Sequence, residues 1–510
     1  MELEYTLERK LTGGIRLLAN KTQSTATGIR RGFVPRQVVL ALKQHRGSPA
    51  VPVVAVGDEV RKGQLVAAPG SPPSAAVHAS TSGRVRAIEE RTVPGGKGLE
   101  RSLCVVVEAD GLDQPADLAP PGWPATREER LRVLRDGGLA GLGGAVFPTA
   151  DKLAVSGECK ALIVNGAECE PYISCDDMLM REAAPEIVAG ALAMADLLGA
   201  PLCIMAVERD KPRAIEALAA AARAVGDPRL RLAEVRTVYP AGGERQLIEL
   251  LTGEEVPSGG YPIDIGYVCQ NVGTAYALAR WLDAGEPLIA RVVTVTGKGV
   301  RQPQNVLAPL GTPFAELVAL CGGYTDDVAR LVVGGSMMGY AVPDDDLPVT
   351  KAVNCIFAAG ADEVRADEDE WPCIRCGDCA SACPAGLLPQ ELLSAAEAHD
   401  MEDLDALGLF DCIECGCCDV VCPSQIRLTE RFRVAKREYA LHEERERFAA
   451  ETEARVKRRE QRRADAERRE AEIRQALKEA VRHDPESGRK AIEEAVRRAR
   501  ERREQGREPD

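Results

Sequence analysis

Two cysteine-rich stretches have the residue types and the spacing for metal chemistry. "CIRCGDCASACP" begins at Cys373 and "CIECGCCDVVCP" begins at Cys412, and both place cysteines as C-x2-C-x2-C-x3-C followed by proline. A [4Fe–4S] cluster needs four thiolates, and in the bacterial two-cluster pattern the fourth cysteine of each run ligates the other cluster. The doubled spacing therefore predicts two [4Fe–4S] clusters whose ligand sets cross between the two stretches.

This crossing rule assigns four cysteines to each cluster. One cluster takes Cys373, Cys376, Cys379 and Cys422, and the other takes Cys383, Cys412, Cys415 and Cys418. Pro384 and Pro423 would turn the chain away after each crossing, whereas Cys417 does not fit the spacing. A pair of zinc sites is the alternative, because C-x2-C pairs also bind zinc. The repeated x3-C-P ending favours iron–sulfur clusters.

The composition is typical of a soluble protein with several globular domains. Of the 510 residues, 45% are hydrophobic and 4% are aromatic, and no run approaches the roughly 18 apolar residues of a membrane span. The first residues, "MELEYTLERK", are charged and lack the apolar segment of an export signal. We therefore expect a reducing environment, in which the 17 cysteines indicate metal or redox chemistry rather than disulfides.

Charge is distributed unevenly along the chain. The total is −14, but the residues from Leu441 onward include 19 acidic and 21 basic side chains, so the first 440 residues carry −16. An acidic body argues against a nucleic-acid partner. Mixed signs at helical spacing predict that residues 440–510 form a solvated helix with i,i+4 ion pairs, broken near Pro485 and Gly488, or a partly disordered appendage.

Residues 30–110 are predicted to form short strands separated by turns. Val-rich runs flank Gly57-Asp58, and this pattern predicts a hairpin there. The segment resembles the barrel-sandwich fold of lipoyl and biotin carriers. It has no counterpart of their modifiable lysine, so we expect a structural or docking role.

From residue 125 the pattern changes to strands that alternate with helices. Strands are predicted at "ALIVNG" (161–166), "LCIMAV" (202–207) and "LRLAEVRTV" (230–238), and helices over 183–199, 213–225 and from 245. This alternation indicates a mostly parallel sheet covered by helices, which would bind ligands at the carboxyl ends of its strands. A smaller α+β unit is predicted to follow at 288–350.

Three glycine-rich or polar loops fall where such a sheet would present a ligand. The first, "GLAGLGGAVFPTADKL" (138–153), has glycines that let backbone N–H groups approach a phosphate. The second, "NGAECEPYISCDD" (165–177), is rich in acids, and the third is "YPAGGERQL" (239–247), followed by "PSGGYP" and "CQNVGT" (269–274). One such loop is weak evidence, but three upstream of iron–sulfur ligands predict a cofactor site.

Several of these stretches together resemble a known family. "GLGGAVFPTADKL", "NGAECEPY", "YPAGGERQL", "QNVGT" and "CIECGCCDVVCPS" resemble, in order and spacing, the C subunit of the Rnf-type ion-translocating electron-transport complex, over residues 5–435. The central domain is also similar to the flavin-bearing subunit of respiratory complex I, which binds FMN and NADH on such loops. The stretch after it resembles the soluble-ligand-binding β-grasp domain of that subunit.

The resemblance implies a multidomain fold of α/β and β parts. The expected parts are a barrel-sandwich domain at 1–115, a complex I flavoprotein-like FMN- and NADH-binding α/β domain at 125–285, a β-grasp domain at 288–350, a ferredoxin-like two-cluster helical module at 366–432 and a charged helical tail at 440–510.

The resemblance also implies which residues line the flavin and nicotinamide site. They are Gly141, Gly143, Gly144, Phe147 and Lys152 of the first loop; Asn165, Glu168, Glu170 and Asp177 of the second; Gly242, Gly243 and Glu244 of the third; and Asn271 and Thr274 of the last. No catalytic residue is expected, because direct hydride transfer needs no protein acid or base. Val146 stands where the family usually has glycine, and its Cβ would lie beside the cofactor.

As a member of this family, the chain would pass electrons between NADH, FMN and two [4Fe–4S] clusters. A flavin exchanges electrons in pairs or singly, whereas a cluster accepts one at a time. Integral membrane subunits would couple this flow to Na+ or H+ movement and to ferredoxin or flavodoxin. The subunit would be peripheral, at the cytoplasmic face of the bacterial inner membrane, and its acidic loops favour NADH over NADPH.

Two other functions fit the same residues. One is a soluble flavoprotein such as the corrin reductases of bacterial microcompartments, which would copurify with shell proteins rather than membranes. The other is a two-cluster scaffold whose nucleotide site has decayed, and Val146 motivates it. Such a scaffold would bind clusters but give no NADH-dependent reduction.

Overall fold

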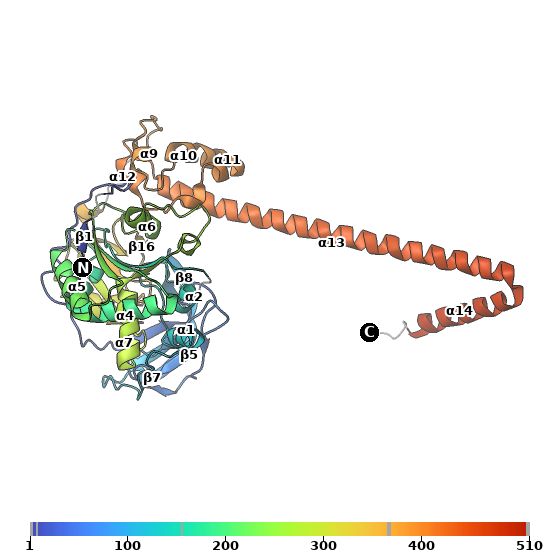
Figure 1. The fold of residues 1–510 in the computed structure, drawn as a ribbon, viewed down its shortest axis with the longest axis horizontal. Coiled ribbons are helices and arrows are strands. Elements are labelled where there is room, and N and C mark those ends of the chain that lie inside the picture. The colour runs from blue at the N-terminus through green and yellow to red at the C-terminus, as the bar shows by residue number, and fades with distance from the viewer. Residues whose placement is uncertain (1–3, 7–8, 155–156, 365–368, 506–510) are drawn as a thin grey trace. The chain divides into compact units, whose positions relative to one another are not determined.

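The computed structural model describes residues 4–6, 9–154, 157–364 and 369–505 (Figure 1). The predicted start of the cluster module at residue 366 lies outside the described residues. The chain divides into two compact units, Met1–Arg433 and Val434–Asp510, which are described separately.

The N-terminal domain consists of two small sheets that face one another across an apolar core. One sheet has the order β2-β8-β7-β4 and the other β3-β5-β6. Their bounds are β2 (Gln37–Ala41), β3 (Val51–Pro52), β4 (Glu59–Val60), β5 (Leu65–Ala68), β6 (Val77–His78), β7 (Gly83–Pro94) and β8 (Leu99–Ala109). Buried side chains such as Val38, Leu40, Val66 and Val105 fill the space between the sheets, as expected for alternating strand patterns.

The prediction of a hairpin at Gly57-Asp58 is wrong. The chain does turn there, with Gly57 at φ +99°, but β3 pairs with β5 and β4 pairs with β7. The turn therefore joins strands of two different sheets. Short strands carry too little side-chain pattern to specify their partners.

A five-stranded parallel sheet forms the centre of the first unit. Its order is β1-β11-β10-β9-β12, and each neighbouring pair is parallel. The strands are β1 (Glu4–Thr6), β9 (Ala161–Gly166), β10 (Cys203–Glu208), β11 (Leu230–Val235) and β12 (Tyr267–Asn271). β1 comes from the beginning of the chain and pairs with β11, so this sheet includes a strand from outside the predicted range 125–285.

Apolar side chains cover both faces of this sheet. On one face, Leu162, Val164 and Met205 belong to the main core with α4 and α5, and on the other Ile163 and Ile204 pack with α6. Buried strands of a parallel sheet are apolar on both sides for this reason. The helices are α1 (Arg127–Asp136), α2 (Thr149–Leu153), α3 (Cys175–Glu182), α4 (Ala184–Leu198), α5 (Pro212–Val225), α6 (Glu244–Thr252), the short 3-10 helix η1 (Pro262–Ile265) and α7 (Val272–Ala284).

The "CQNVGT" segment is not a loop, contrary to the sequence prediction. Cys269–Asn271 end β12, and α7 begins at Val272 without a connecting segment. The Asn271 side chain accepts a hydrogen bond from the Gly273 N–H at 2.8 Å and caps α7.

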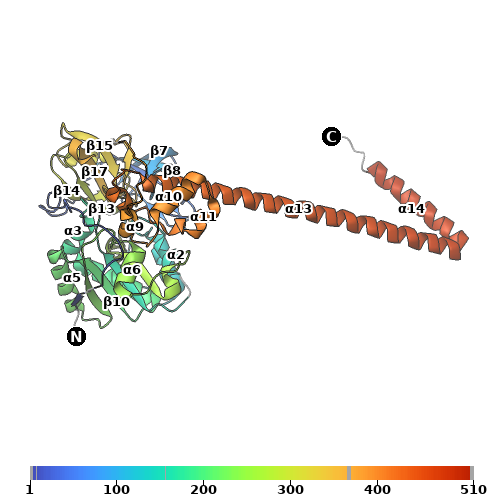
Figure 2. The same cartoon turned by 90° about the horizontal axis from the view of Figure 1, so that it is seen from above.

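A second, mixed sheet follows, and Figure 2 shows it apart from the sheet that contains β10. Its order is β14-β13-β17-β15-β16. The elements are β13 (Ala290–Thr296), β14 (Gln304–Pro309), α8 (Phe314–Leu320), β15 (Val328–Val333), β16 (Tyr340–Val342), β17 (Cys355–Gly360) and the 3-10 helix η2 (Ala361–Glu363). Because β17 lies at the centre of the sheet, the unit extends beyond residue 350.

The two cysteine stretches fold in the same way. Arg375 and Glu414 have φ of +55° and +60°, and Gly377 and Gly416 have φ of +84° and +77°. In each half the left-handed glycine begins a short helix that ends at the cysteine before proline. The module's helices are α9 (Asp378–Ala382), α10 (Pro389–Ala398), α11 (Met401–Ala406), η3 (Leu409–Asp411) and α12 (Cys417–Val421).

The charged tail is helical, with α13 (Leu428–His483) beginning in the first unit and α14 (Pro485–Gln505) following it. Ion pairs at i,i+4 join Glu451 to Arg455 and Glu494 to Arg498. The break between the helices falls at Asp484, next to the predicted Pro485. Within the described part of the chain, no helix has the length and apolar character needed to cross a bilayer.

Gly190 tests how closely α4 and α7 pack. A Cβ at this position would lie 1.9 Å from the Ala275 carbonyl oxygen of α7. We expect Gly190→Ala to lower the free energy of unfolding by roughly 2 kcal/mol, because overpacking outweighs the better helix propensity of alanine. Urea unfolding measures the change. The neighbouring exposed Ala189→Gly should cost only about 1 kcal/mol, and a stable Gly190→Ala would contradict the observed packing.

Candidate functional site

The eight predicted cysteine ligands line two small cavities, four in each. Cys373, Cys376, Cys379 and Cys422 line the first, which we call the outer cavity. Cys383, Cys412, Cys415 and Cys418 line the second, the inner cavity, together with Cys417. The structure therefore brings the two sequence-predicted groups together, each with three cysteines of one stretch and one of the other.

Apolar side chains complete both cavities. Ile374, Leu393, Ile426 and Leu428 line the outer cavity, and Ile413, Leu387, Leu392 and Phe432 line the inner one. A set of four thiols inside an apolar lining fits an iron–sulfur cluster, which takes thiolate ligands and is tuned by the exclusion of solvent. The donor set alone also fits a four-cysteine zinc site.

The loop that carries Cys412, Cys415 and Cys418, which we call the ligand loop, attaches the inner cavity to the domain of the parallel sheet. The Tyr239 hydroxyl donates to the Cys415 carbonyl oxygen at 2.7 Å, and the Ser258 hydroxyl donates to Asp411 at 2.6 Å. Met337 Cε lies 3.5 Å from the position of a Cβ on Gly416. The inner cavity is thus the one beside the predicted flavin loops.

The outer cavity faces solvent. Cys373 and Cys376 are exposed, and the neighbouring Trp371 and Ile374 each retain 68% of their accessible surface. The Trp371 N–H donates to the Ser424 carbonyl oxygen at 2.9 Å, which ties the two cysteine stretches together. A group held in this cavity would lie close to the molecular surface.

The first predicted flavin loop combines internal and accessible groups. The Gly141 N–H donates to the Phe147 carbonyl oxygen at 2.8 Å, and the Leu142 N–H donates to the buried Thr274 hydroxyl at 3.0 Å. Gly143 is exposed, and a Cβ on Gly144 would meet no described atom within 4 Å. Thr274 therefore holds the loop, while Gly143 and Gly144 leave room for a ligand to approach the backbone.

Val146 occupies a backbone conformation that suits glycine. Its φ is +47°, which is strained for a β-branched residue. The side chain is buried, with Cγ2 4.0 Å from the position of a Cβ on Gly96 in the turn of the β7–β8 hairpin. Its carbonyl oxygen accepts from the Arg46 N–H at 3.0 Å. Val146 thus packs against the N-terminal domain.

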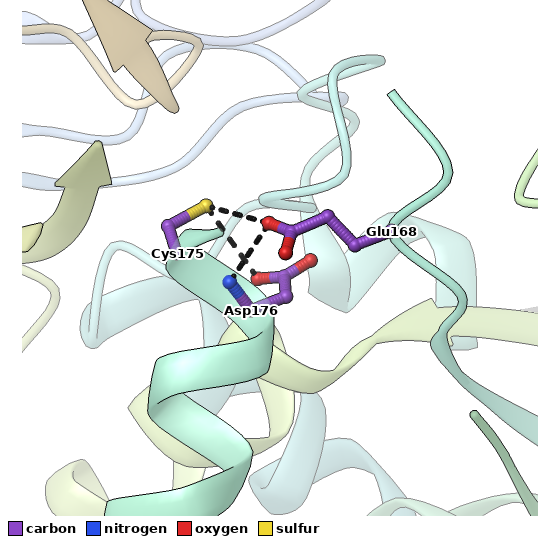
Figure 3. Close-up of side chains that lie close together, drawn as sticks. All are labelled: Glu168, Cys175 and Asp176. Atoms are coloured by element: carbon purple, nitrogen blue, oxygen red, sulfur yellow. Dashed lines mark hydrogen bonds between the residues drawn. The ribbon is translucent and has the colours of Figure 1, made fainter. Parts of the chain in front are cut away.

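In the second loop, Glu168 caps a helix. Its carboxylate accepts hydrogen bonds from the Asp176 N–H at 2.9 Å and from the Cys175 thiol at 3.3 Å, at the start of α3 (Figure 3). Ligand atoms of these three residues lie within 4.8 Å of one another. Lys21 forms an ion pair with Glu168 at 3.9 Å. Helix capping and this ion pair account for the buried carboxylate.

Glu170 and Asp177 are also committed to internal contacts. The Glu170 carboxylate accepts hydrogen bonds from the Met337 N–H at 2.7 Å and the Met338 N–H at 3.2 Å. These bonds join the second loop to the segment between β15 and β16 of the mixed sheet. Desolvation raises the pKa of Glu170. Asp177 is buried and pairs with Arg181 on the next turn of α3. Glu170 therefore positions the second loop, whereas the Asp177 carboxylate is paired within α3.

The third loop is fixed to both of the others. Asn165 donates from Nδ2 to the Gly242 carbonyl oxygen at 2.9 Å and accepts from the Ala167 N–H at 2.9 Å. Lys152 pairs with Glu244 at 2.6 Å, and both side chains remain partly exposed. Gly242 and Gly243 are half-buried. The predicted residues therefore gather at the carboxyl edge of the sheet, with Lys152 as an accessible cation.

Asn271 connects the last segment to the second loop. Its Nδ2 donates to the Asp176 carboxylate at 2.6 Å, and its Cβ lies 3.3 Å from the position of a Cβ on Gly143. The glycines near Asn271 and the accessible cation Lys152 fit a phosphate-bearing flavin.

Three contributors to the site had no signal in the sequence. Lys21 reaches Glu168 from the N-terminal segment, and buried Arg291 of β13 donates to the Leu142 carbonyl oxygen at 3.2 Å. Tyr239 lies in the quoted "YPAGGERQL" but is not among the predicted site residues. All three act across more than 140 residues of chain, and no local pattern specifies such contacts.

Asp176 makes the stability of this region depend on pH. Desolvation and the neighbouring Glu168 raise the pKa of Asp176 to about 7 from 3.8. At pH values between 3.8 and about 7, Asp176 is deprotonated in the unfolded chain but stays protonated in the folded chain. The wild-type chain should therefore lose unfolding free energy relative to Asp176→Asn as pH rises from about 4 to 7, by at most about 1.4 kcal/mol per pH unit.

Urea titrations of the flavin-free chain over this range measure the difference. Asp362→Asn is the control, because the exposed Asp362 pairs with Lys298 and this partner lowers its pKa. Parallel pH profiles for the wild type and Asp176→Asn would contradict a protonated Asp176.

Models of four known domains match successive parts of the chain. They are the RnfC barrel sandwich hybrid domain at 9–112, the Nuo51 FMN-binding domain at 134–280, the SLBB domain at 292–341 and the 4Fe-4S dicluster domain at 365–437. These matches confirm the predicted fold class and favour iron–sulfur clusters over zinc. They also indicate FMN as a cofactor.

Whole-chain comparisons identify relatives with one shared description, the C subunit of an ion-translocating oxidoreductase complex. The relative from Pseudomonas aeruginosa is 45% identical over 469 residues, which cover 90% of this chain and 60% of the relative. The relative from Rhodobacter capsulatus is 42% identical over 430 residues, 84% of this chain and 82% of the relative. This chain spans about half to three-fifths of the Vibrio cholerae and Pseudomonas relatives.

Among solved structures, an NAD+-reducing [NiFe]-hydrogenase in the H2-reduced state shares 22% identity at a TM-score of 0.42, over 62% of this chain and 61% of that one. A likeness of this size carries no conclusion. The four domain matches and the two long alignments agree with the resemblance that the loop and cysteine stretches indicated. The chain belongs to the family of the C subunit of the ion-translocating oxidoreductase complex.

Proposed function

We propose that the chain is the peripheral electron-transfer subunit of an Rnf-type complex, and that it passes electrons between NADH, FMN and two [4Fe–4S] clusters. One observation carries the proposal: the eight predicted cysteine ligands line two cavities, four in each, and the inner cavity lies beside the flavin-type loops of a parallel sheet and is joined to them through Tyr239. Bound FMN would exchange electrons with NADH in pairs and with the clusters singly.

Side chains and backbone groups of the protein would hold the FMN and the two clusters in separate places. The backbone at Gly143 and Gly144, with Lys152 nearby, would receive the FMN phosphate. The Glu168 carboxylate would keep the second loop in place against the start of α3. Apolar side chains keep water from the inner cavity, whereas the exposed Cys373 and Cys376 open the outer cavity to a partner. The inner cluster would lie between the flavin and the outer cluster.

We further propose that this protein docks on integral membrane subunits at the cytoplasmic face of the bacterial inner membrane. Those subunits would couple the electron flow to Na+ or H+ transport and to ferredoxin or flavodoxin. The names of the relatives support this assembly, because they describe one part of an ion-translocating complex.

Paired cysteine variants test the ligand assignment. Cys376→Ser and Cys422→Ser should each remove the outer cluster, although the two residues come from different stretches. Cys383→Ser and Cys412→Ser should each remove the inner cluster. In every case iron and sulfide per chain should fall by about half, and the two variants of a pair should share one EPR spectrum.

Cys321→Ala is the control, because Cys321 is a buried thiol outside both cavities. It should keep the full iron content. If Cys376→Ser and Cys383→Ser lost the same cluster, each cluster would take its ligands from one stretch, and this result would refute the crossed assignment.

Anaerobic titration with NADH tests the electron path. In the full chain reconstituted with iron, sulfide and FMN, NADH should bleach the flavin absorbance and then produce the EPR signal of reduced clusters. NADPH should act at least about tenfold more slowly, since a 2′-phosphate prefers arginine over these acidic loops. Clusters that accept electrons from dithionite but ignore NADH would leave the chain as a scaffold with a decayed nucleotide site.

A further inference from the structure

We propose that Tyr239 is a positioning residue that sets the inner cluster's reduction potential and its rate of reduction from the flavin. The inference rests on the proposed function for its second part. Tyr239 is 3% exposed, and it lies three residues before Gly242 of the third loop.

The main chain of Tyr239 is clamped by the N-terminal segment. The Ile15 N–H donates to the Tyr239 carbonyl oxygen at 2.8 Å, and the Tyr239 N–H donates to the Ile15 carbonyl oxygen at 3.0 Å. In the same segment the Gly14 N–H donates to the Ala382 carbonyl oxygen at 2.9 Å, beside Cys383. The N-terminal segment therefore links the backbone of Tyr239, in the sheet's domain, to the cysteine module.

The hydroxyl of Tyr239 is the direct connection to the inner cavity. It donates to the carbonyl oxygen of Cys415, a predicted ligand, at 2.7 Å. Tyr239 also packs in one apolar cluster with Cys169 of the second loop. Cys417 Sγ lies 4.0 Å from the Tyr239 carbonyl oxygen. The Tyr239 side chain thus contacts both the second flavin loop and the ligand loop, and the residues that follow Tyr239 form the third flavin loop.

This contact should affect redox properties rather than only packing. A donor on the Cys415 carbonyl oxygen offsets part of the negative charge beside the cluster, and a reduced cluster is more negative than an oxidised one. Hydrogen bonds and partial charges around the ligands are among the features that set cluster potentials. Loss of the hydroxyl should therefore make the inner cluster harder to reduce, and it should also loosen the ligand loop.

Tyr239→Phe removes the hydroxyl and keeps the ring. The midpoint potential of the inner cluster, measured by EPR in a mediator titration with dithionite, should become more negative. The measurement is made in a Cys376→Ser background, where the outer cluster is absent. Tyr267→Phe is the matched control. Tyr267, the first residue of β12, is also buried, and its hydroxyl donates to the Glu254 carboxylate at 2.6 Å. The control should leave the potential unchanged.

Stopped-flow reduction by NADH supplies the second readout, in chains with both clusters. Tyr239→Phe should leave the flavin phase unchanged and slow the cluster phase about tenfold. Iron and sulfide analysis shows whether the variant still carries its clusters. A variant that loads the outer cluster and not the inner one would also support positioning by Tyr239.

The two ideas fail in different ways. If wild-type flavin ignores NADH, the proposed function fails, while the dithionite titration still reports on Tyr239. If Tyr239→Phe has the potential and the cluster phase of the wild type, the role of Tyr239 is refuted, whatever NADH does.

Discussion

The amide of Asn165 holds together the edge of the sheet on which the site depends. This side chain lies one residue before the end of β9. It donates to the Gly242 carbonyl oxygen of the third loop and accepts from the Ala167 N–H in the second loop. Carboxyl ends of parallel strands meet at one edge, so loops far apart in the chain converge there. A single bridging amide then fixes the spacing between two loops, and Lys152 with Glu244 fixes the spacing between the first and the third.

The cysteine module shows why spacing can be a strong predictor. In each stretch, three cysteines with two residues between neighbours wrap one cavity, and the helices α9 and α12 then bring Cys383 and Cys422 to the opposite cavities. Each tight wrap uses two left-handed residues, and glycine takes this conformation without steric cost at Gly377 and Gly416, whereas Arg375 and Glu414 adopt it despite their Cβ atoms. Such information is local, and for this reason the sequence alone could predict the two groups of four.

Contacts across long separations were not predictable in this way. The parallel sheet followed from the alternation of strands and helices, but β1 joins it from the other end of the chain, at Glu4 beside Leu232. The Gly57-Asp58 turn was recognised while its strand partners were not, because two-residue strands have no face pattern. Lys21, Arg291 and Tyr239 contribute to the site through tertiary packing alone, and no periodicity or motif carries that information.

The pairing of β1 with β11 makes the barrel-sandwich domain an insertion in the topological sense. The chain leaves the sheet after β1, builds that domain and returns to the sheet's domain at α1. A domain attached by two crossings can hinge less freely than one attached by a single linker. The outgoing crossing also carries Ile15 and Lys21, so a rotation of this domain would pull directly on the Tyr239 clamp and on the Glu168 cap. A displacement of the barrel-sandwich domain would thus reach both flavin-type loops along the segment that carries Ile15 and Lys21.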